Sequence, residues 1–185
     1  AIQVGAQNCS WEQDGPYTGE ISPRMLKNLG CSHVILGHSE RKQLGETLEM
    51  VQKKLKAALM AGLIPIVCIG EEVEKEMEII FQGIENCLPA GDVPKGQKLV
   101  LVYEPEWAIS TSPNAKPDTP ANAQKAIGQI KKIAGNDFPV LYGGSTNSNN
   151  IKSFLGPELA QGALVGGASL DAKEFIALVK NAALV

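Results

Sequence analysis

The sequence predicts an α/β fold in which parallel strands alternate with helices, and two observations carry this prediction. Six short apolar segments along the 185 residues are each followed by a helical segment, at a spacing typical of βα repeats. Polar or glycine-rich residues follow strand after strand, which favours a barrel with its site at one face. An open doubly wound nucleotide binder also fits the alternation, but it should carry a GxGxxG turn after its first strand, and none is present.

The six expected strands are short runs of apolar residues bounded by glycine, proline or polar residues. In chain order they are 2–7, 33–36, 64–69, 99–103, 140–142 and 163–165. Strands joined by helices run parallel and are covered on their faces, so continuous apolar runs are expected in place of strict alternation. The fourth strand has the clearest end, because Glu104 is followed by Pro105 and proline cannot continue a central strand.

Six helices are expected between and after these strands. In chain order they are 22–30, 48–62, 72–87, 120–135, 150–155 and 171–183. The first and fourth begin with an N-cap residue followed by proline, at Ser22-Pro23 and Thr119-Pro120, and both end at a glycine. Apolar residues recur on one face of the second, third and fourth helices, as expected for helices that cover a sheet. The fifth helix is weak.

Length and composition predict one domain over residues 1–185, with 44% hydrophobic residues to build its core. A net charge of −3 without a basic block argues against a nucleic-acid partner, and no apolar run is long enough to span a membrane. The four cysteines are dispersed and form no CxxC pair, so no metal is expected, and reduced thiols fit a cytoplasmic protein. The start has no signal-peptide pattern and no Met, so we expect the natural chain to begin earlier.

Two titratable side chains lie directly after expected strands and are candidates for catalysis. Glu104 ends the fourth strand, where it either serves a site or merely faces water at the end of the sheet. His38 follows the second strand in LGHSERK and can lie at the N-terminus of a short helix, although a surface histidine is an equal alternative. His33 begins a strand without a polar cluster, so a packing role is favoured for it.

The loops after the last two strands are candidates for phosphate binding. They contain Ser145 and the pair Gly166-Gly167, and glycines allow backbone N–H groups to approach a phosphate. The alternative is that these glycines only serve tight turns. The polar segment 107–120 is expected to be a lid that excludes water, with an ordinary mobile loop as its alternative.

Seven motifs together resemble the triosephosphate isomerase family. In order along nearly the whole chain they are GAQN, PYTGEIS, VILGHSERK, PIVCIGE, YEPEWAI, YGGS and ALVGGASL. The resemblance implies a TIM-type (β/α) barrel, with six βα units visible in this sequence. It also implies an isomerase of glycolysis and gluconeogenesis that interconverts dihydroxyacetone phosphate and D-glyceraldehyde 3-phosphate without a cofactor.

The resemblance also implies roles for individual residues. Glu104 matches the base that moves a proton between two substrate carbons, His38 matches the electrophile that polarises the carbonyl, and Glu40 matches an acid beside the site. The matched phosphate-binding positions are Ser110, Ser145, Gly166 and Gly167. The matched lid positions are Trp107, Ile109 and Thr111. Tyr17 and Thr18 lie in a loop that inserts into a neighbouring subunit in the family, which implies a homodimer or a higher homo-oligomer.

Three departures from the family pattern bear on function. Two further βα units precede the matched region in the family, and the first supplies an Asn and a Lys that the sequence lacks, so the sheet is expected to be an open or incomplete barrel. Ser110 and Ser112 replace lid glycines, which predicts altered closure, and the segment 71–99 is short. An alternative function is therefore an impaired homologue that binds phosphate ligands or serves assembly. A weaker alternative is another barrel enzyme acting on a phosphorylated metabolite.

Overall fold

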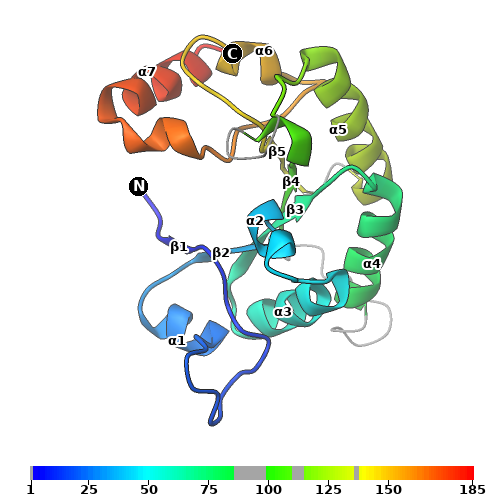
Figure 1. Ribbon diagram of the computed structural model, residues 1–185, viewed down its shortest axis with the longest axis vertical. Coiled ribbons are helices and arrows are strands. Elements are labelled where there is room, and N and C mark those ends of the chain that lie inside the picture. Colours follow the sequence, from blue (N-terminus) through cyan, green and yellow to red (C-terminus); the bar gives the residue numbers. More distant parts are fainter. Residues whose placement is uncertain (1, 86–98, 110–114, 136–137) are drawn as a thin grey trace. The chain divides into compact units, whose positions relative to one another are not determined.

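The computed structural model describes residues 2–85, 99–109, 115–135 and 138–185, and over them strands alternate with helices (Figure 1). The strands are β1 (Gly5–Ala6), β2 (His33–Leu36), β3 (Ile64–Ile69), β4 (Val100–Tyr103) and β5 (Val140–Tyr142). They form one sheet in the order β1-β2-β3-β4-β5, with parallel pairing of β1 with β2, β2 with β3 and β4 with β5. Within the described residues the sheet is therefore parallel and open.

The helices of the described residues agree closely with the sequence prediction. They are α1 (Pro23–Asn28), α2 (Ser39–Gln43), α3 (Leu48–Met60), α4 (Val73–Glu85), α5 (Pro120–Ala134), α6 (Ile151–Phe154) and α7 (Ala172–Ala182). Two 3-10 turns are also present: η1 (Glu106–Ala108) follows β4, and η2 (Gly167–Leu170) lies between α6 and α7. Ser22 and Thr119 accept backbone N–H groups as side-chain N-caps, which confirms both Pro-containing helix starts. None of the described helices has the length and apolarity needed to cross a membrane.

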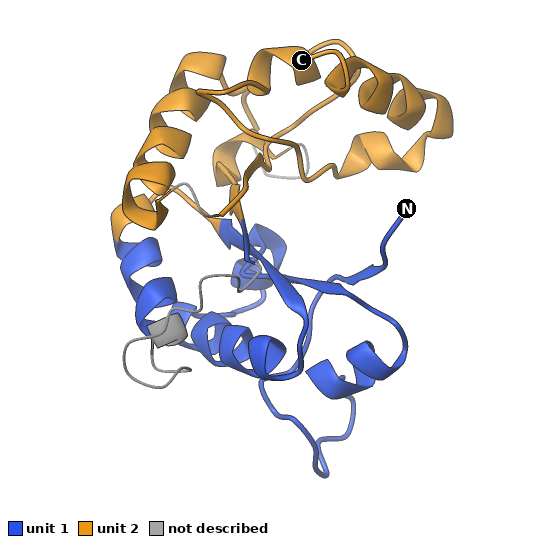
Figure 2. Cartoon of the chain, turned by 180° about the vertical axis from the view of Figure 1, so that it is seen from behind, with its two compact units in different colours: residues 1–68, 75–100 blue, residues 69–74, 101–185 orange. Residues whose placement is uncertain are grey.

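Contacts divide the chain into two compact units (Figure 2). Unit 1 comprises residues 1–68 and 75–100, and unit 2 comprises residues 69–74 and 101–185. α1, α2 and α3 thus lie in unit 1 and α5, α6 and α7 in unit 2, while α4 is divided between the two units.

The core of unit 1 lies between β2, β3 and the apolar face of α3. Val34 and Val67 from the strands and Leu55 from the helix are each fully buried. Gly37 ends β2 with a φ of +71°, in the left-handed region that favours glycine. An added Cβ at Gly37 would lie 3.3 Å from the carbonyl oxygen of Cys68, so the turn after β2 is packed tightly against β3.

The core of unit 2 is built around β4, β5 and α5. Leu101 pairs with Val140 in the parallel ladder, and Ile127 of α5 is fully buried. The ring of Tyr142 stacks on that of Phe154 in α6, with centroids 4.1 Å apart and planes within 5°. This stack fixes α6 against the end of β5, because both rings are almost completely buried.

Two expected strands differ from the structure. In the segment 2–7 only Gly5 and Ala6 form a strand, because only these residues pair with β2 while the side chains of Ile2 and Val4 are exposed. The expected strand 163–165 is wrong: Ala163 forms a single bridge to Tyr142 and no ladder continues from it. Gly162 lies directly before Ala163 and Gly166-Gly167 directly after Val165, and glycines favour irregular backbone over a strand. The end of the expected helix 72–87 lies beyond the described residues.

Candidate functional site

Glu104 lies where β4 ends, as the sequence predicts, and its side chain is 1% exposed. Its backbone N–H donates to the carbonyl oxygen of Ile69 at 2.8 Å, which holds the end of β4 to the end of β3. Pro105 then turns the chain into η1. A carboxylate buried at the carboxyl end of a parallel strand is in the position where barrel enzymes carry their chemistry.

Two glycines after β5 bring the next loop against this strand end. The N–H of Gly143 donates to the carbonyl oxygen of Tyr103 at 2.7 Å, and an added Cβ on Gly143 would lie 3.4 Å from Cβ of Glu104. An added Cβ on Gly144 would lie 2.2 Å from the hydroxyl oxygen of Tyr142. Both positions therefore require glycine because of close packing, and the loop passes next to Glu104.

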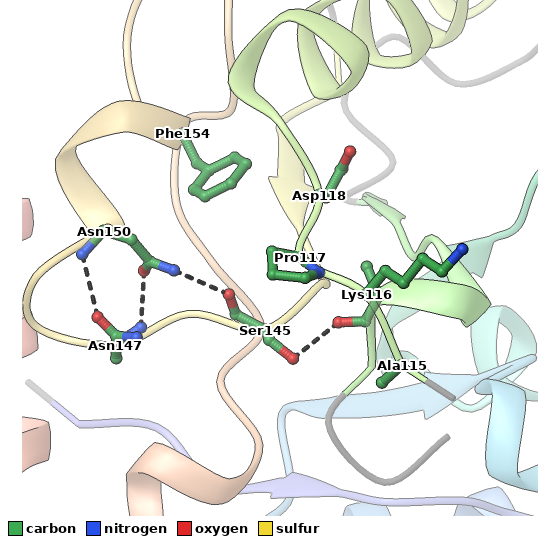
Figure 3. A pocket seen from close by; sticks show the side chains of 9 residues that line it. Ala115, Lys116, Pro117, Asp118, Ser145, Asn147, Asn150 and Phe154 are labelled. Carbon is green, nitrogen blue, oxygen red and sulfur yellow. Dashed lines mark hydrogen bonds between the residues drawn. The ribbon is translucent and has the colours of Figure 1, made fainter. Parts of the chain in front are cut away.

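Ser145 is bonded to the segment that follows Glu104. Its backbone N–H and its hydroxyl both donate to the carbonyl oxygen of Ala108, at 3.1 and 2.7 Å. The amide of Asn150 donates to the carbonyl oxygen of Ser145 at 3.1 Å and holds the loop from the other side (Figure 3). The backbone N–H and the hydroxyl of Ser145, an expected phosphate-binding residue, thus both donate to the carbonyl oxygen of Ala108 in η1.

A cavity of about 250 Å³ lies between the segment 115–118 and the loop 145–150. Its lining includes Ser145, Asn147, Asn150, Lys116, Asp118 and Phe154, and the Lys116 side chain extends away from the two asparagines (Figure 3). The cavity therefore adjoins the Ser145 loop within unit 2.

Asp118 anchors the segment 115–118 to both strands of unit 2. Its carboxylate accepts hydrogen bonds from the Tyr142 hydroxyl at 3.3 Å and from the Asn122 amide at 2.9 Å. The same amide donates to the Tyr103 hydroxyl at 3.2 Å. Burial and the Asp118 charge raise the pKa of Tyr103 to about 12 and raise that of Tyr142 further, so both phenols stay protonated at neutral pH.

Gly166 and Gly167 lie on the surface of unit 2 at the start of η2. The N–H and hydroxyl of Ser169 both donate to the carbonyl oxygen of Gly166, at 2.9 and 2.7 Å, and close this turn. No atom lies within 4 Å of an added Cβ on Gly166, so packing does not require glycine there.

His38 is the N-cap residue of α2 in unit 1, which confirms its expected place at the start of a short helix. Its Nδ1 accepts the backbone N–H of Glu40 at 3.2 Å, so the proton of the neutral ring is on Nε2. A Glu40 carboxylate oxygen lies 3.9 Å from the same Nδ1, but its side chain is 62% exposed and its charge is screened. His38 can therefore offer Nε2–H as a hydrogen-bond donor.

The expected subunit loop is exposed in unit 1. Tyr17 is 45% exposed, Thr18 is also exposed, and the nearby Glu12 raises the pKa of the Tyr17 phenol. Lys53 of α3 lies over the ring of Trp11, with Nζ 5.7 Å from the ring centroid. The loop thus presents aromatic surface at the position where the resemblance implies contact with another subunit.

Of the residues expected in the lid and in the phosphate site after β4, some lie within the described residues and others do not. Trp107 and Ile109 are half-buried on either side of Ala108, in and just after η1. Ser110 and Thr111 lie outside the described residues. Unit 2 thus brings Glu104, the described lid residues and the Ser145 loop together, whereas His38 and Glu40 belong to unit 1.

Two features of the site were not predicted from the sequence. The Ala108 carbonyl has no sequence signature, because every residue carries one. Asp118 is a polar residue between two prolines and next to an N-cap, so its only signal is that of an ordinary turn. Across the described residues, no group of three or more His, Cys, Asp or Glu side chains is arranged to hold a metal ion.

Comparisons with known proteins agree on one family. A family model described as triosephosphate isomerase matches residues 1–182. The triosephosphate isomerase of Dictyoglomus thermophilum is 44% identical to this chain over 195 residues, which cover 98% of this chain and 77% of that protein. That of Geobacter metallireducens is 46% identical over 195 residues, covering 96% of this chain and 75% of the relative.

A solved structure shows the same fold. The crystal structure of triosephosphate isomerase from Bartonella henselae superposes with a TM-score of 0.75 at 34% identity, covering 97% of this chain and 77% of that chain. This likeness confirms the fold class as a TIM-type (β/α) barrel, of which the five described strands are a parallel portion.

Proposed function

The chain belongs to the triosephosphate isomerase family, and we propose that it interconverts dihydroxyacetone phosphate and D-glyceraldehyde 3-phosphate. The observation that carries the proposal is the carboxylate of Glu104, which is buried at the end of a parallel strand and next to the glycine-serine loop after β5. No contact of the described residues favours an impaired binding module over the enzyme.

Glu104 is the base of the proposed reaction. Its carboxylate removes a proton from the carbon next to the substrate carbonyl and leaves an enediolate. It then returns the proton to the neighbouring carbon, while a hydroxyl proton moves between the two oxygens, so no atom is gained or lost. Burial of Glu104 keeps bulk water from the reactive intermediate.

His38 is the proposed electrophile. Because Nδ1 accepts the backbone N–H of Glu40, the proton of the neutral ring is on Nε2. A neutral ring that donates from Nε2 stabilises the oxygen on which negative charge develops, and such donors contribute strongly to catalysis in a site with little water. Glu40 lies beside this ring and is proposed to take part in the same site.

The substrate phosphate is proposed to bind at Ser110, Ser145, Gly166 and Gly167, with Trp107, Ile109 and Thr111 in the lid over the site. Backbone N–H groups and a hydroxyl suit a phosphate because they donate without adding bulk. We further propose that residues 1–185 form a single barrel domain, that the protein acts in the cytoplasm, and that Tyr17 and Thr18 lie in a subunit interface of a homodimer or higher homo-oligomer.

A coupled isomerase assay on the purified protein tests the proposal. Glu104→Gln keeps the shape of the side chain and removes the base, so turnover should fall by about 100- to 10,000-fold. Glu106→Gln removes a carboxylate two residues further along the same segment and should retain turnover. In D₂O the unaltered protein should incorporate deuterium at the carbon from which Glu104 removes the proton, and Glu104→Gln should not.

Equal activity of Glu104→Gln and the unaltered protein would contradict the role of Glu104. Absence of turnover and of deuterium exchange in the unaltered protein would contradict the proposed function itself.

A further inference from the structure

Glu46 is a buried carboxylate of unit 1 that the proposed reaction does not use. It lies between α2 and α3, and its side chain is 2% exposed. Its Oε2 is bonded to Nζ of Lys54 and lies 3.4 Å from Nε of Arg41, while its Oε1 accepts the backbone N–H of Gly37 at 3.3 Å. All of these groups belong to one unit.

The partner Lys54 is buried as deeply. Its side chain is 5% exposed, and Nζ also donates to Oδ1 of Asn8 at 2.9 Å, in the loop after β1. Burial raises the pKa of the adjacent Cys9 thiol to about 12, so Cys9 adds no charge to the cluster at neutral pH. Glu46 and Lys54 are buried opposite charges, which are costly to separate. Their contacts link the loop after β1, the turn after β2, α2 and α3.

The positions that Glu46 holds lie on both sides of His38. Gly37, directly before His38, is buried in the left-handed conformation, and its N–H points to Glu46. Arg41, three residues after His38 in α2, is bonded to the same carboxylate. Because α2 has only five residues, it has little stability of its own and needs such anchors.

We propose that Glu46 is the positioning residue for His38, fixing the turn on either side of the imidazole so that Nε2 is aimed at the substrate oxygen. This inference rests on the proposed isomerase function. Displacement of a catalytic group by about 1 Å can cost about 100-fold in rate. Loss of the Glu46 contacts should therefore lower kcat and leave KM nearly unchanged, since His38 does not hold the phosphate.

The experiment compares Glu46→Gln with a matched control, Glu76→Gln, whose carboxylate lies on α4 and pairs with α2. Glu76 is 5% exposed and pairs with Lys42 of α2 at 3.1 Å. Glu76→Gln therefore removes another buried carboxylate that contacts α2, without changing the contact to Gly37. Glu46→Gln should lower kcat by about 10- to 100-fold with KM within about 3-fold, whereas Glu76→Gln should retain kcat. Imidazole ¹⁵N NMR should show altered His38 signals only in Glu46→Gln.

A double variant separates positioning from stability. Glu46→Gln leaves Lys54 as an unpaired buried ammonium, so the melting temperature should fall. Glu46→Gln combined with Lys54→Met removes this charge and should recover the melting temperature, while kcat stays low. Recovery of kcat together with stability would overturn the proposal, as would a loss of kcat in Glu76→Gln equal to that in Glu46→Gln.

Failure of the proposed function gives a different result. In that case the unaltered protein has no isomerase turnover, yet the His38 NMR signals still report whether Glu46 fixes the imidazole. Unchanged His38 signals in Glu46→Gln would overturn the positioning role independently of any activity.

Discussion

Gly143→Ala is predicted to disturb Glu104 without changing residue 104 itself. The added Cβ would lie 2.7 Å from Cγ1 of Val102, 3.2 Å from the carbonyl oxygen of Tyr103 and 3.4 Å from Cβ of Glu104. Real Cβ atoms do not approach carbon at 2.7 Å, so either the loop or β4 must move. The Tyr103 contact is to backbone, which cannot rotate away as a side chain can.

The magnitude follows from the cost of overpacking. An extra methyl group in a close-packed region costs about 1–3 kcal/mol, and the hydrogen bond from Gly143 N–H to Tyr103 is strained at the same time. Because the shift acts on the residue before Glu104 and on Glu104 itself, kcat should also fall by about 10- to 100-fold. Urea unfolding and the isomerase assay measure the two effects.

Gly128→Ala provides the matched control. Gly128 lies inside α5, and no atom lies within 4 Å of its added Cβ. Replacing an unhindered helix glycine by alanine should stabilise the protein by about 0.5–1 kcal/mol. If Gly143→Ala unfolds at the same urea concentration as the unaltered protein and keeps its kcat, the packing at the end of β4 does not position Glu104.

Two further predictions concern the same unit. The pKa of Tyr103 is raised from 10.0 to about 12, so its contribution to stability is complete below about pH 10 and is lost as pH rises from 10 to 12. The loss amounts to about 2–3 kcal/mol. Tyr103→Phe should therefore show a smaller fall in unfolding free energy between pH 9 and pH 11 than the unaltered protein. An equal fall in both proteins would contradict this prediction. Ser145→Ala removes a hydroxyl donor from the proposed phosphate site and should raise KM for triose phosphate by about 10-fold, with little change in kcat. A loss confined to kcat would place Ser145 elsewhere in the reaction.

The helices and strands that were predicted well are those whose ends are determined by neighbouring residues in the sequence. Ser22 and Thr119 each precede a proline, and a capping side chain followed by a fixed φ determines a helix start without help from tertiary structure. The strand 64–69 is predicted to the residue, because an apolar run between glycines has few alternatives. The strand at 163–165 failed because strand formation needs a ladder, and apolar residues alone do not specify pairing.

The candidate site could be predicted where a single side chain carries the proposed chemistry. Glu104 is a carboxylate held at a strand end by proline, and both facts are visible in the sequence. Glu46 and Lys54 were not predicted, because a glutamate and a lysine eight positions apart are also typical of an exposed surface. Only the fold shows that both are buried and that the carboxylate reaches the turn before His38.

The contacts of Ser145 connect phosphate binding with the segment that follows Glu104. Both Ser145 donors are occupied by the Ala108 carbonyl, and a hydroxyl or N–H given to phosphate cannot keep the same bond to Ala108. In the proposed site, a phosphate that accepts either donor of Ser145 removes one of the two bonds that hold η1, which begins two residues after Glu104. Charge-assisted hydrogen bonds to phosphate are stronger than the neutral bonds they replace, so the exchange favours the liganded arrangement. In the proposed reaction, binding of the substrate phosphate at Ser145 is thereby coupled to the backbone that follows Glu104.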